Sequence, residues 1–155
     1  MKTIMAIITL LFVGSTVTSN ASDLFTAKET TLSFFGTYVD QTGDDWGLGA
    51  GVTHFITRHL GVGAVTHWEN FDGPFFDNLA GEAYFRLPLG SLPLAPYAVG
   101  AVGYTFENDE WFESFGAGAE WRFSKKLGVF GDFQWQFNND TDDGVGLRIG
   151  ARLTF

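Results

Sequence analysis

The sequence predicts an all-β protein, an eight-stranded antiparallel up-and-down transmembrane β-barrel. The first observation is the segment 144–155, GVGLRIGARLTF, where apolar and polar residues alternate and give a strand one apolar and one polar face. The second is that seven further segments repeat this alternation at about the length that a tilted strand needs to cross a bilayer. The third is an apolar leader, which indicates export. Such strands need lipid outside and polar groups inside, and a closed barrel supplies both.

The predicted strands follow one another in hairpins, and their even number brings both chain ends to one side of the membrane. One of them, 97–105, is ambiguous because Tyr97 and Tyr104 have opposite parity, so it requires either a bulge or one inward tyrosine. The expected strands are 31–39, 46–56, 60–69, 79–87, 97–105, 112–123, 127–137 and 144–155.

The connections between these strands alternate between compact turns and longer acidic loops. Compact turns are typical of the periplasmic side of a barrel and longer loops of the outer side. We expect all four prolines in connections or at the first position of a strand, where a missing N–H does no harm. The compact turns are 57–59, 88–96 and 124–126, and the acidic loops are 40–45, 70–78, 106–111 and 138–143.

Aromatic residues are expected in two girdles, one at each membrane interface. Next to the acidic loops, the girdle would contain Tyr38, Trp46, Trp68, Tyr104, Trp111 and Trp135. Next to the compact turns, it would contain Phe55, Tyr97, Trp121, Phe123 and Phe155.

Residues 1–21 have the features of a signal peptide. Lys2 precedes an apolar run at 4–14, and Ser19 and Ala21 occupy the small-residue positions of a cleavage site. The run is about half of the roughly 20 residues that a membrane-spanning helix needs, so an anchor helix is disfavoured. Residues 22–155 are then one outer-membrane barrel domain, in which 22–28 is a polar lead-in with no assigned role.

Composition excludes several kinds of site. The chain has no cysteine and a formal net charge of −9, which excludes thiol chemistry and argues against nucleic acid as a partner. His54, His59 and His67 do not share a face, so we expect no metal site. The acidic segment 138–144 lacks the glycine and glutamate of a calcium-binding loop, although it leaves loose divalent-cation bridging to lipid phosphates open. No cofactor is expected.

Charged residues at inward positions of the strands form the main candidate site. A barrel of eight strands is just wide enough for side chains to fill, so these charges must pair with one another. We interpret the set as a plug of ion pairs and hydrogen bonds that fixes the barrel's shape, with a pore lining or a catalytic carboxylate pair as alternatives. The expected members are Glu69, Glu82, Arg86, Glu120, Arg122, Asp132, Arg148 and Arg152.

These features together resemble the small outer-membrane β-barrel family that includes OmpX-like, opacity-type and OmpA transmembrane-domain proteins. The resemblance covers residues 31–155. Its marks are WGLGAGVTHFITRHLGVGA at 46–64, PYAVGAVGY at 96–104, FGAGAEWRFSKKLGVFGDF at 115–133 and the final IGARLTF. The fold hosts many roles, so it identifies an architecture better than an activity.

The resemblance implies an integral protein of the outer membrane, a monomer among outer-membrane lipid and lipopolysaccharide. It also implies that the barrel assembly machinery recognises the last strand, with Ile149, Ala151, Leu153 and Phe155 matching that signal. Lipid A deacylases share this barrel and carry a His-x-Ser pair in the strand before the last. Residues 132–137 read DFQWQF and contain neither residue, so the resemblance does not extend to that activity.

The sequence therefore predicts a non-enzymatic barrel protein that supports outer-membrane integrity and presents acidic loops to the outside. Binding of an unidentified surface ligand through those loops is the first alternative, a narrow channel is the second, and a lipid-modifying enzyme is the third.

Overall fold

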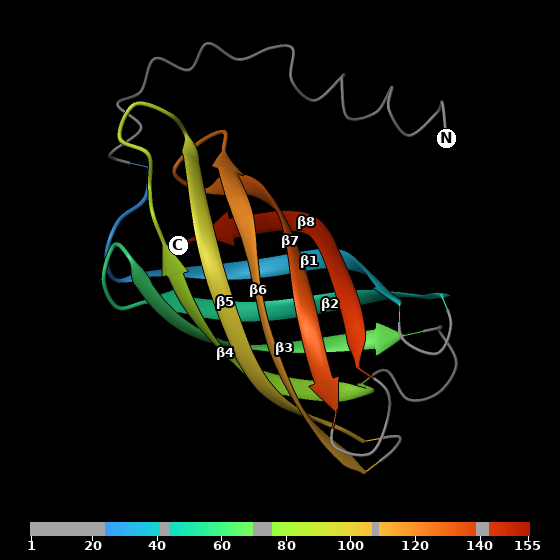
Figure 1. Ribbon diagram of the computed structural model, residues 1–155. Coiled ribbons are helices and arrows are strands. Elements are labelled where there is room, and N and C mark those ends of the chain that lie inside the picture. Colours follow the sequence, from blue (N-terminus) through green and yellow to red (C-terminus); the bar gives the residue numbers. More distant parts are fainter. Residues whose placement is uncertain (1–23, 41–43, 70–75, 107–108, 139–142) are drawn as a thin grey trace, which may run out of the picture.

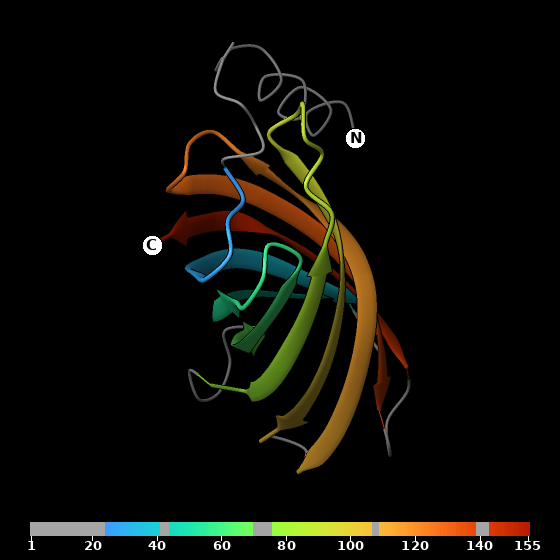
Figure 2. The ribbon, with the colours of Figure 1, turned by 90° about the vertical axis from the view of Figure 1, so that its left-hand side faces the viewer.

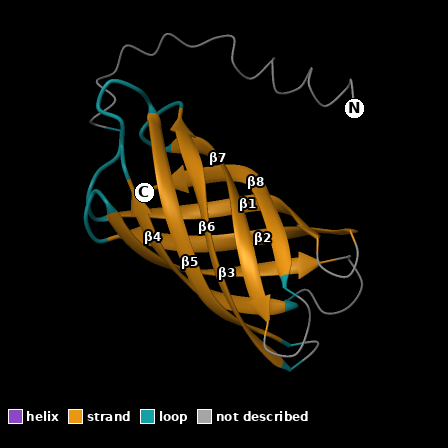
Figure 3. Ribbon diagram, viewed as in Figure 1, coloured by secondary structure: helices purple, strands orange, loops and turns teal. Residues whose placement is uncertain are grey.

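The computed structural model describes residues 24–40, 44–69, 76–106, 109–138 and 143–155, with backbone only at Asp44, Asp45 and Glu69. It confirms the predicted fold class: eight antiparallel strands form one closed barrel in which each strand pairs with its neighbours in the chain and β1 pairs with β8 (Figure 1). The strands are β1 Glu29–Asp40, β2 Asp44–Phe55, β3 Leu60–Glu69, β4 Asn78–Arg86, β5 Leu94–Thr105, β6 Glu110–Arg122, β7 Leu127–Asn138 and β8 Gly144–Thr154. The described residues contain strands and loops but no helix that could cross a membrane (Figure 3).

The barrel has two different ends. The start of β1, the end of β8 and the connections β2–β3, β4–β5 and β6–β7 lie together, at the upper left of Figure 1, and we call this the turn end. The ends of β1, β3, β5 and β7 and the starts of β2, β4, β6 and β8 lie at the opposite end, which we call the loop end. All the long acidic connections of the sequence belong to the loop end.

The alternation along each strand separates an apolar outer face from a mixed, buried interior. Along β4, for example, every second residue from Asn78 to Arg86 is buried and the residues between them are exposed. The outer face presents large apolar side chains that no other part of the described chain covers, among them Phe34, Leu48 and Ile149. This arrangement is the reverse of a soluble protein, in which such side chains form the core.

Inward glycines allow this narrow barrel to close around large side chains. A Cβ atom on Gly116 would lie 2.0 Å from the carbonyl oxygen of Phe133 on β7, and one on Gly150 would lie 2.2 Å from that of Phe34 on β1. A side chain at either position would therefore force the backbone of the paired strands to shift.

Two aromatic residues expected in the girdle next to the compact turns lie inside the barrel instead. Tyr97 and Phe55 are both buried, and β5 pairs with β4 and β6 in continuous register without a bulge. The ambiguity in β5 is thus resolved by an inward Tyr97, while Tyr104 faces outward. Tyrosine can take the inward position because its hydroxyl finds a polar partner there.

The expectation for Pro96 was also wrong, because β5 begins at Leu94 and contains this proline as its third residue. The segment Leu94–Pro96 pairs with β6 but extends beyond the residues of β5 that pair with β4. The missing N–H therefore removes no bond from the ladder between β4 and β5.

The lead-in, for which the sequence suggested no role, closes the turn end. Leu24 and Phe25 are buried and form a small cluster with Ala95. Figure 2 shows the lead-in, in blue, passing across the opening of the barrel before β1 begins at Glu29. β1 therefore starts two residues before the predicted position, and Glu29 points into the barrel.

Gly116→Ala should destabilise the folded barrel by about 1–3 kcal/mol, because the new methyl group would overlap the backbone of β7. The matched control is Gly100→Ala on β5, where a Cβ would meet nothing closer than the Ser114 oxygen at 3.8 Å. Urea unfolding in detergent, followed by gel migration with and without boiling, measures both. Equal midpoints for the two variants would contradict the packing argument.

Candidate functional site: the buried charge network

Two groups of ionised side chains fill the barrel. The first, which we call the central cluster, contains Arg148, Glu82 and Asp132. Arg148 Nη1 lies 2.7 Å from Glu82 Oε1, while its Nε and Nη2 donate to the two oxygens of Asp132 at 2.8 and 3.1 Å. The bond pair to Asp132 is bidentate, the geometry in which arginine binds carboxylates most strongly.

Neutral polar groups complete the central cluster. The hydroxyl of Tyr97 donates to Asp132 Oδ2 at 2.6 Å, and that of Tyr84 donates to Glu82 Oε2 at 2.7 Å. Gln134 donates to Asp132 Oδ1 at 3.1 Å and accepts a bond from Ser114 at 2.8 Å. Each carboxylate is therefore bound by an arginine and at least one further donor, as burial of a charge requires.

The second group, the turn-end cluster, contains Arg86, Arg122 and Arg152 with Glu29 and Glu120. Glu29 Oε1 lies 2.7 Å from Arg86 Nη1 and 2.6 Å from Arg122 Nη2. Glu120 forms ion pairs with two arginines. Its Oε1 lies 2.6 Å from Arg122 Nε, and its Oε2 lies 2.8 Å from Arg152 Nη1. These residues come from β1, β4, β6 and β8, so the cluster ties distant strands together across the interior.

The lead-in supplies backbone acceptors to the turn-end cluster. The carbonyl of Thr26 accepts a bond from Arg86 Nη2 at 3.0 Å, and that of Leu24 accepts one from Arg122 Nη1. The Phe25 ring lies 4.4 Å from the guanidinium carbon of Arg122, within the range of a cation–π contact. The lead-in therefore both covers the turn-end cluster and takes part in its hydrogen bonds.

An aromatic layer joins the two clusters. The guanidinium of Arg152 lies over the rings of Phe130, Tyr97 and Tyr84 at 4.2, 5.0 and 5.3 Å. The hydroxyls of the same two tyrosines bind the carboxylates of the central cluster. Each tyrosine therefore touches a cation with its ring and an anion with its hydroxyl.

The structure brings together seven of the eight charged residues expected in the interior, and it supplies the fourth carboxylate from an unexpected position. The side chain of Glu69 lies outside the described residues. Glu29 takes part in the network instead, and four arginines meet four carboxylates in the described interior. The sequence could have revealed the inward position of Glu29, because this residue continues the alternation that places Thr31 and Ser33 inside.

One space beside the central cluster leaves no room for solvent. The space between Ser33, Thr53, Glu82, Tyr84 and Arg148 admits no water-sized sphere. Both carboxylates of the cluster are buried and are held by the same arginine. Chemically, this arrangement can stabilise the shape of the barrel.

The histidines lie in three different places, as parity predicted. His54 is exposed on the outer face of β2, His59 lies in the β2–β3 turn, and His67 packs inside against Phe35. Within the described ranges, no group of three His, Cys, Asp or Glu side chains could hold a metal ion.

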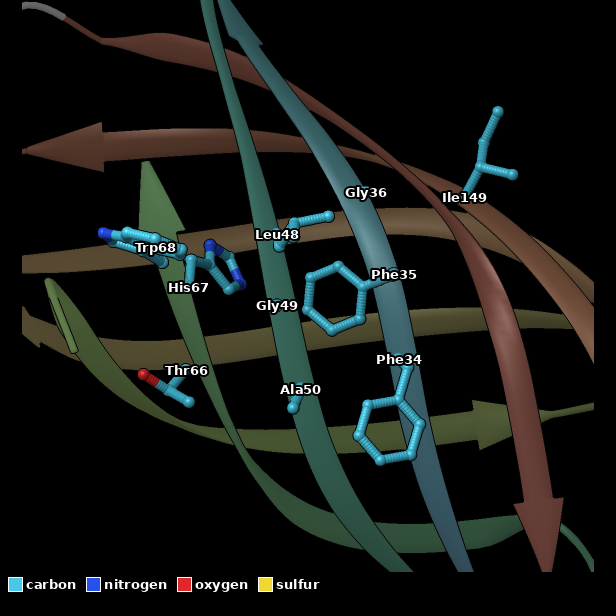
Figure 4. Close-up of a pocket in the computed structure, with 10 residues that line it drawn as sticks. All are labelled: Phe34, Phe35, Gly36, Leu48, Gly49, Ala50, Thr66, His67, Trp68 and Ile149. Carbon is cyan, nitrogen blue, oxygen red and sulfur yellow. The ribbon is translucent and has the colours of Figure 1, made fainter. Parts of the chain in front are cut away.

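A groove crosses the outer face of β1, β2 and β3. It encloses about 460 Å³, and Figure 4 shows the residues that line it, from Phe34 and Gly36 on β1 to Thr66 and Trp68 on β3, with Ile149 of β8. Most of its lining is apolar and faces away from the barrel interior.

No family model matches the sequence, and no curated protein is similar to it in sequence. Solved structures share its fold. The N-terminal β-barrel domain of OprF from Pseudomonas aeruginosa is 13% identical, with a TM-score of 0.60 over 84% of this chain and 99% of that one. De novo designed transmembrane β-barrels are 21% identical, with a TM-score of 0.59 over 81% and 95%. Ail of Yersinia pestis, solved with the heparin analogue sucrose octasulfate, is 11% identical, with a TM-score of 0.52 over 83% and 99%.

The natural neighbours are thus small eight-stranded barrels of the outer membrane, and the sequence-based prediction of such a fold is confirmed. At these identities the likeness concerns the fold alone. The designed barrels also show that a similar fold need not mean common ancestry, because they have this architecture and no natural ancestor.

Arg148→Ala should lower the free energy of unfolding by about 3–5 kcal/mol, because it leaves Glu82 and Asp132 buried without their cation. Lys125→Ala, on the exposed β6–β7 turn, is the control and should change little. The triple variant Arg148→Met, Glu82→Gln, Asp132→Asn should regain most of the loss, because no unpaired charge remains. Urea midpoints in detergent measure all three. A triple variant as unstable as Arg148→Ala would show that lost packing, and not unpaired charge, is responsible.

Proposed function

We propose that this protein is a non-enzymatic, monomeric barrel integral to the outer membrane, and that its role is structural. It would reinforce the membrane as a rigid, sealed element and present acidic loops to the outside. The observation that carries the proposal is the filled interior, in which the charges are paired and the space beside the central cluster admits no water.

The outer face supports the membrane location. Exposed side chains such as Trp46, Leu48 and Phe115 would aggregate in water, whereas hydrocarbon solvates them at no penalty. The predicted signal peptide, 1–21, lies outside the described residues, so export remains a prediction. The location in the outer membrane is inferred from this leader together with the barrel fold, since closed barrels of this kind are typical of that membrane.

We also propose that the barrel assembly machinery recognises the last strand. Ile149, Ala151, Leu153 and Phe155 all face outward on one line, and the ring of Phe155 is 73% exposed at the turn end. A strand that displays its apolar face in this way can be contacted from the side during insertion.

The alternatives are weaker on physical grounds. A channel would require a continuous opening, and the paired arginines and the lead-in occupy the interior. An enzyme would require an accessible nucleophile or carboxylate, and those of the central cluster are buried. A surface ligand remains the second candidate, and the acidic loop end favours a cationic one. Ail binds a polyanionic sugar analogue, and that kind of ligand would be repelled here.

Reconstituted protein should give no conductance steps in a planar lipid bilayer, because no water-filled path crosses the network. A porin with an open channel serves as the positive control in the same membrane. Stable unitary currents from the unmodified protein would contradict the sealed-barrel proposal.

Phe155→Ala should reduce the amount of heat-modifiable barrel in the outer membrane several-fold, because the assembly signal loses its terminal aromatic group. The control is Phe137→Ala, which removes an outward aromatic residue from β7 near the loop end. Quantitative blotting of the membrane fraction compares them. Equal yields would remove the support for recognition at this residue.

A further inference from the structure

The cations outside the barrel interior are all at one end. The chain has nine Lys and Arg residues; Lys2 belongs to the predicted leader, and Arg86, Arg122, Arg148 and Arg152 form the network. The remaining four, Lys28, Arg58, Lys125 and Lys126, lie at the turn end. Among the described residues, the carboxylates near that end are Glu29 and Glu120, which are buried and already paired. The described side chains that are exposed at the turn end are therefore more basic than acidic.

One corner of the turn end carries an additional polar pair on the outer face. Thr30 of β1 and His54 of β2 are directly opposite each other, and Thr30 Oγ1 lies 3.1 Å from His54 Nδ1. The next outward residues toward the membrane centre, Leu32 and Val52, are apolar. Polar groups on the outer face are tolerated near the headgroup level, and this pair lies within four residues of the β2–β3 turn. When Thr30 donates to Nδ1, the ring proton of His54 is on Nε2 and is available to an acceptor.

Two of the four cations flank this pair. Lys28 adjoins the end of β2, because its N–H donates to the carbonyl of Phe55 at 2.7 Å. Arg58 lies in the β2–β3 turn, which the interior network fixes through the bond from Arg86 Nε to the Arg58 carbonyl at 2.9 Å. Arg58 Nε is itself buried, and it has no hydrogen-bond partner in the part of the chain that the structure describes. A buried guanidinium N–H without a partner favours binding of an anionic acceptor.

Apolar grooves extend from this corner along the outer face. A groove of about 310 Å³ begins at Leu32 and Val52, crosses Ala50 and Ala64, and is bounded by Phe34 and Leu79. It shares Phe34, Ala50 and Thr66 with the larger groove in Figure 4, which continues toward the loop end. The small outward side chains of Ala50 and Ala64, between larger neighbours, leave a recess in which an apolar chain can lie.

We propose that this corner binds an anionic phospholipid of the inner leaflet. Lys28, Arg58 and His54 bind the phosphate, and one acyl chain lies in the groove over Ala50. The inference rests on the proposed membrane location. Basic side chains at a bilayer surface attract anionic headgroups, and the groove adds apolar contact that a free anion cannot use.

Native mass spectrometry of the detergent-solubilised protein tests the proposal. Phosphatidylglycerol and phosphatidylcholine with identical chains are titrated, and inorganic phosphate is titrated separately. We expect phosphatidylglycerol to be retained about tenfold more strongly than phosphatidylcholine, and inorganic phosphate to be lost. Lys28→Gln with Arg58→Gln should abolish this preference. The matched control, Lys125→Gln with Lys126→Gln, removes the same charge from the same end and should preserve it.

A second variant tests the groove without changing charge. Ala50→Phe fills the recess and should weaken phosphatidylglycerol binding several-fold. If both double variants lost the preference for phosphatidylglycerol equally, the preference would come from general attraction between the basic turn end and anionic lipid, and the proposed site would be overturned. Retention of inorganic phosphate as strong as that of the lipid, or no effect of Ala50→Phe, would overturn the lipid assignment. Each variant is first shown to be heat-modifiable. A folded barrel without lipid preference refutes this inference alone, whereas a protein that is folded and soluble without detergent refutes the proposed function.

Discussion

The desolvation of charge inside the barrel is the constraint on which the rest of this structure depends. The ion-pair network removes four guanidinium groups and four carboxylates from water, and an unpaired member would cost several kcal/mol. The pairing explains why Arg148 contacts two carboxylates and why Glu120 bridges two arginines. The inward glycines serve closure in a different way, since a Cβ at Gly116 or Gly150 would overlap the backbone of the neighbouring strand. The shape of the closed barrel depends on both.

The alternation of residue types predicted most of the fold, because the two faces of each strand meet such different surroundings. Parity alone placed Arg86, Arg122, Asp132 and Arg148 inside, where the structure has them. It could not place Tyr97, because tyrosine suits an interface and a polar interior equally well. What decided its position was the carboxylate of Asp132 on β7, a contact between residues far apart in the chain.

The lead-in shows the second limit of reasoning from pattern. Leu24 and Phe25 belong to no strand, so no period reveals that they are buried. Their place depends on Arg122 and Arg86, which present donors at the turn end only after the barrel has closed. Glu29 was missed for a related reason: it lies two residues outside the predicted strand, next to a segment that appeared irregular. The prediction for Glu69 is still untested.

The separation of charge between the two ends gives the molecule a direction. The interior is balanced, whereas the loop end is acidic in sequence and the turn end is basic. Both proposals follow from this separation: rigidity and closure from the interior, and selective contact with lipid from the basic corner.

The position of Glu29 has a consequence for biogenesis. It lies on the first strand, 93 residues before its partner Arg122, so their ion pair is among the most distant in the chain. Contacts over such separations form late, because the intervening chain must be ordered first. Glu29 is on the first strand and Arg122 is on the sixth, so we expect the ion pair to form only when the intervening strands have curved round to bring these two together. We expect a chain whose strands have not yet curved together to keep Arg86 and Arg122 hydrated at the turn end, so that this end would lose its water only as the barrel closes.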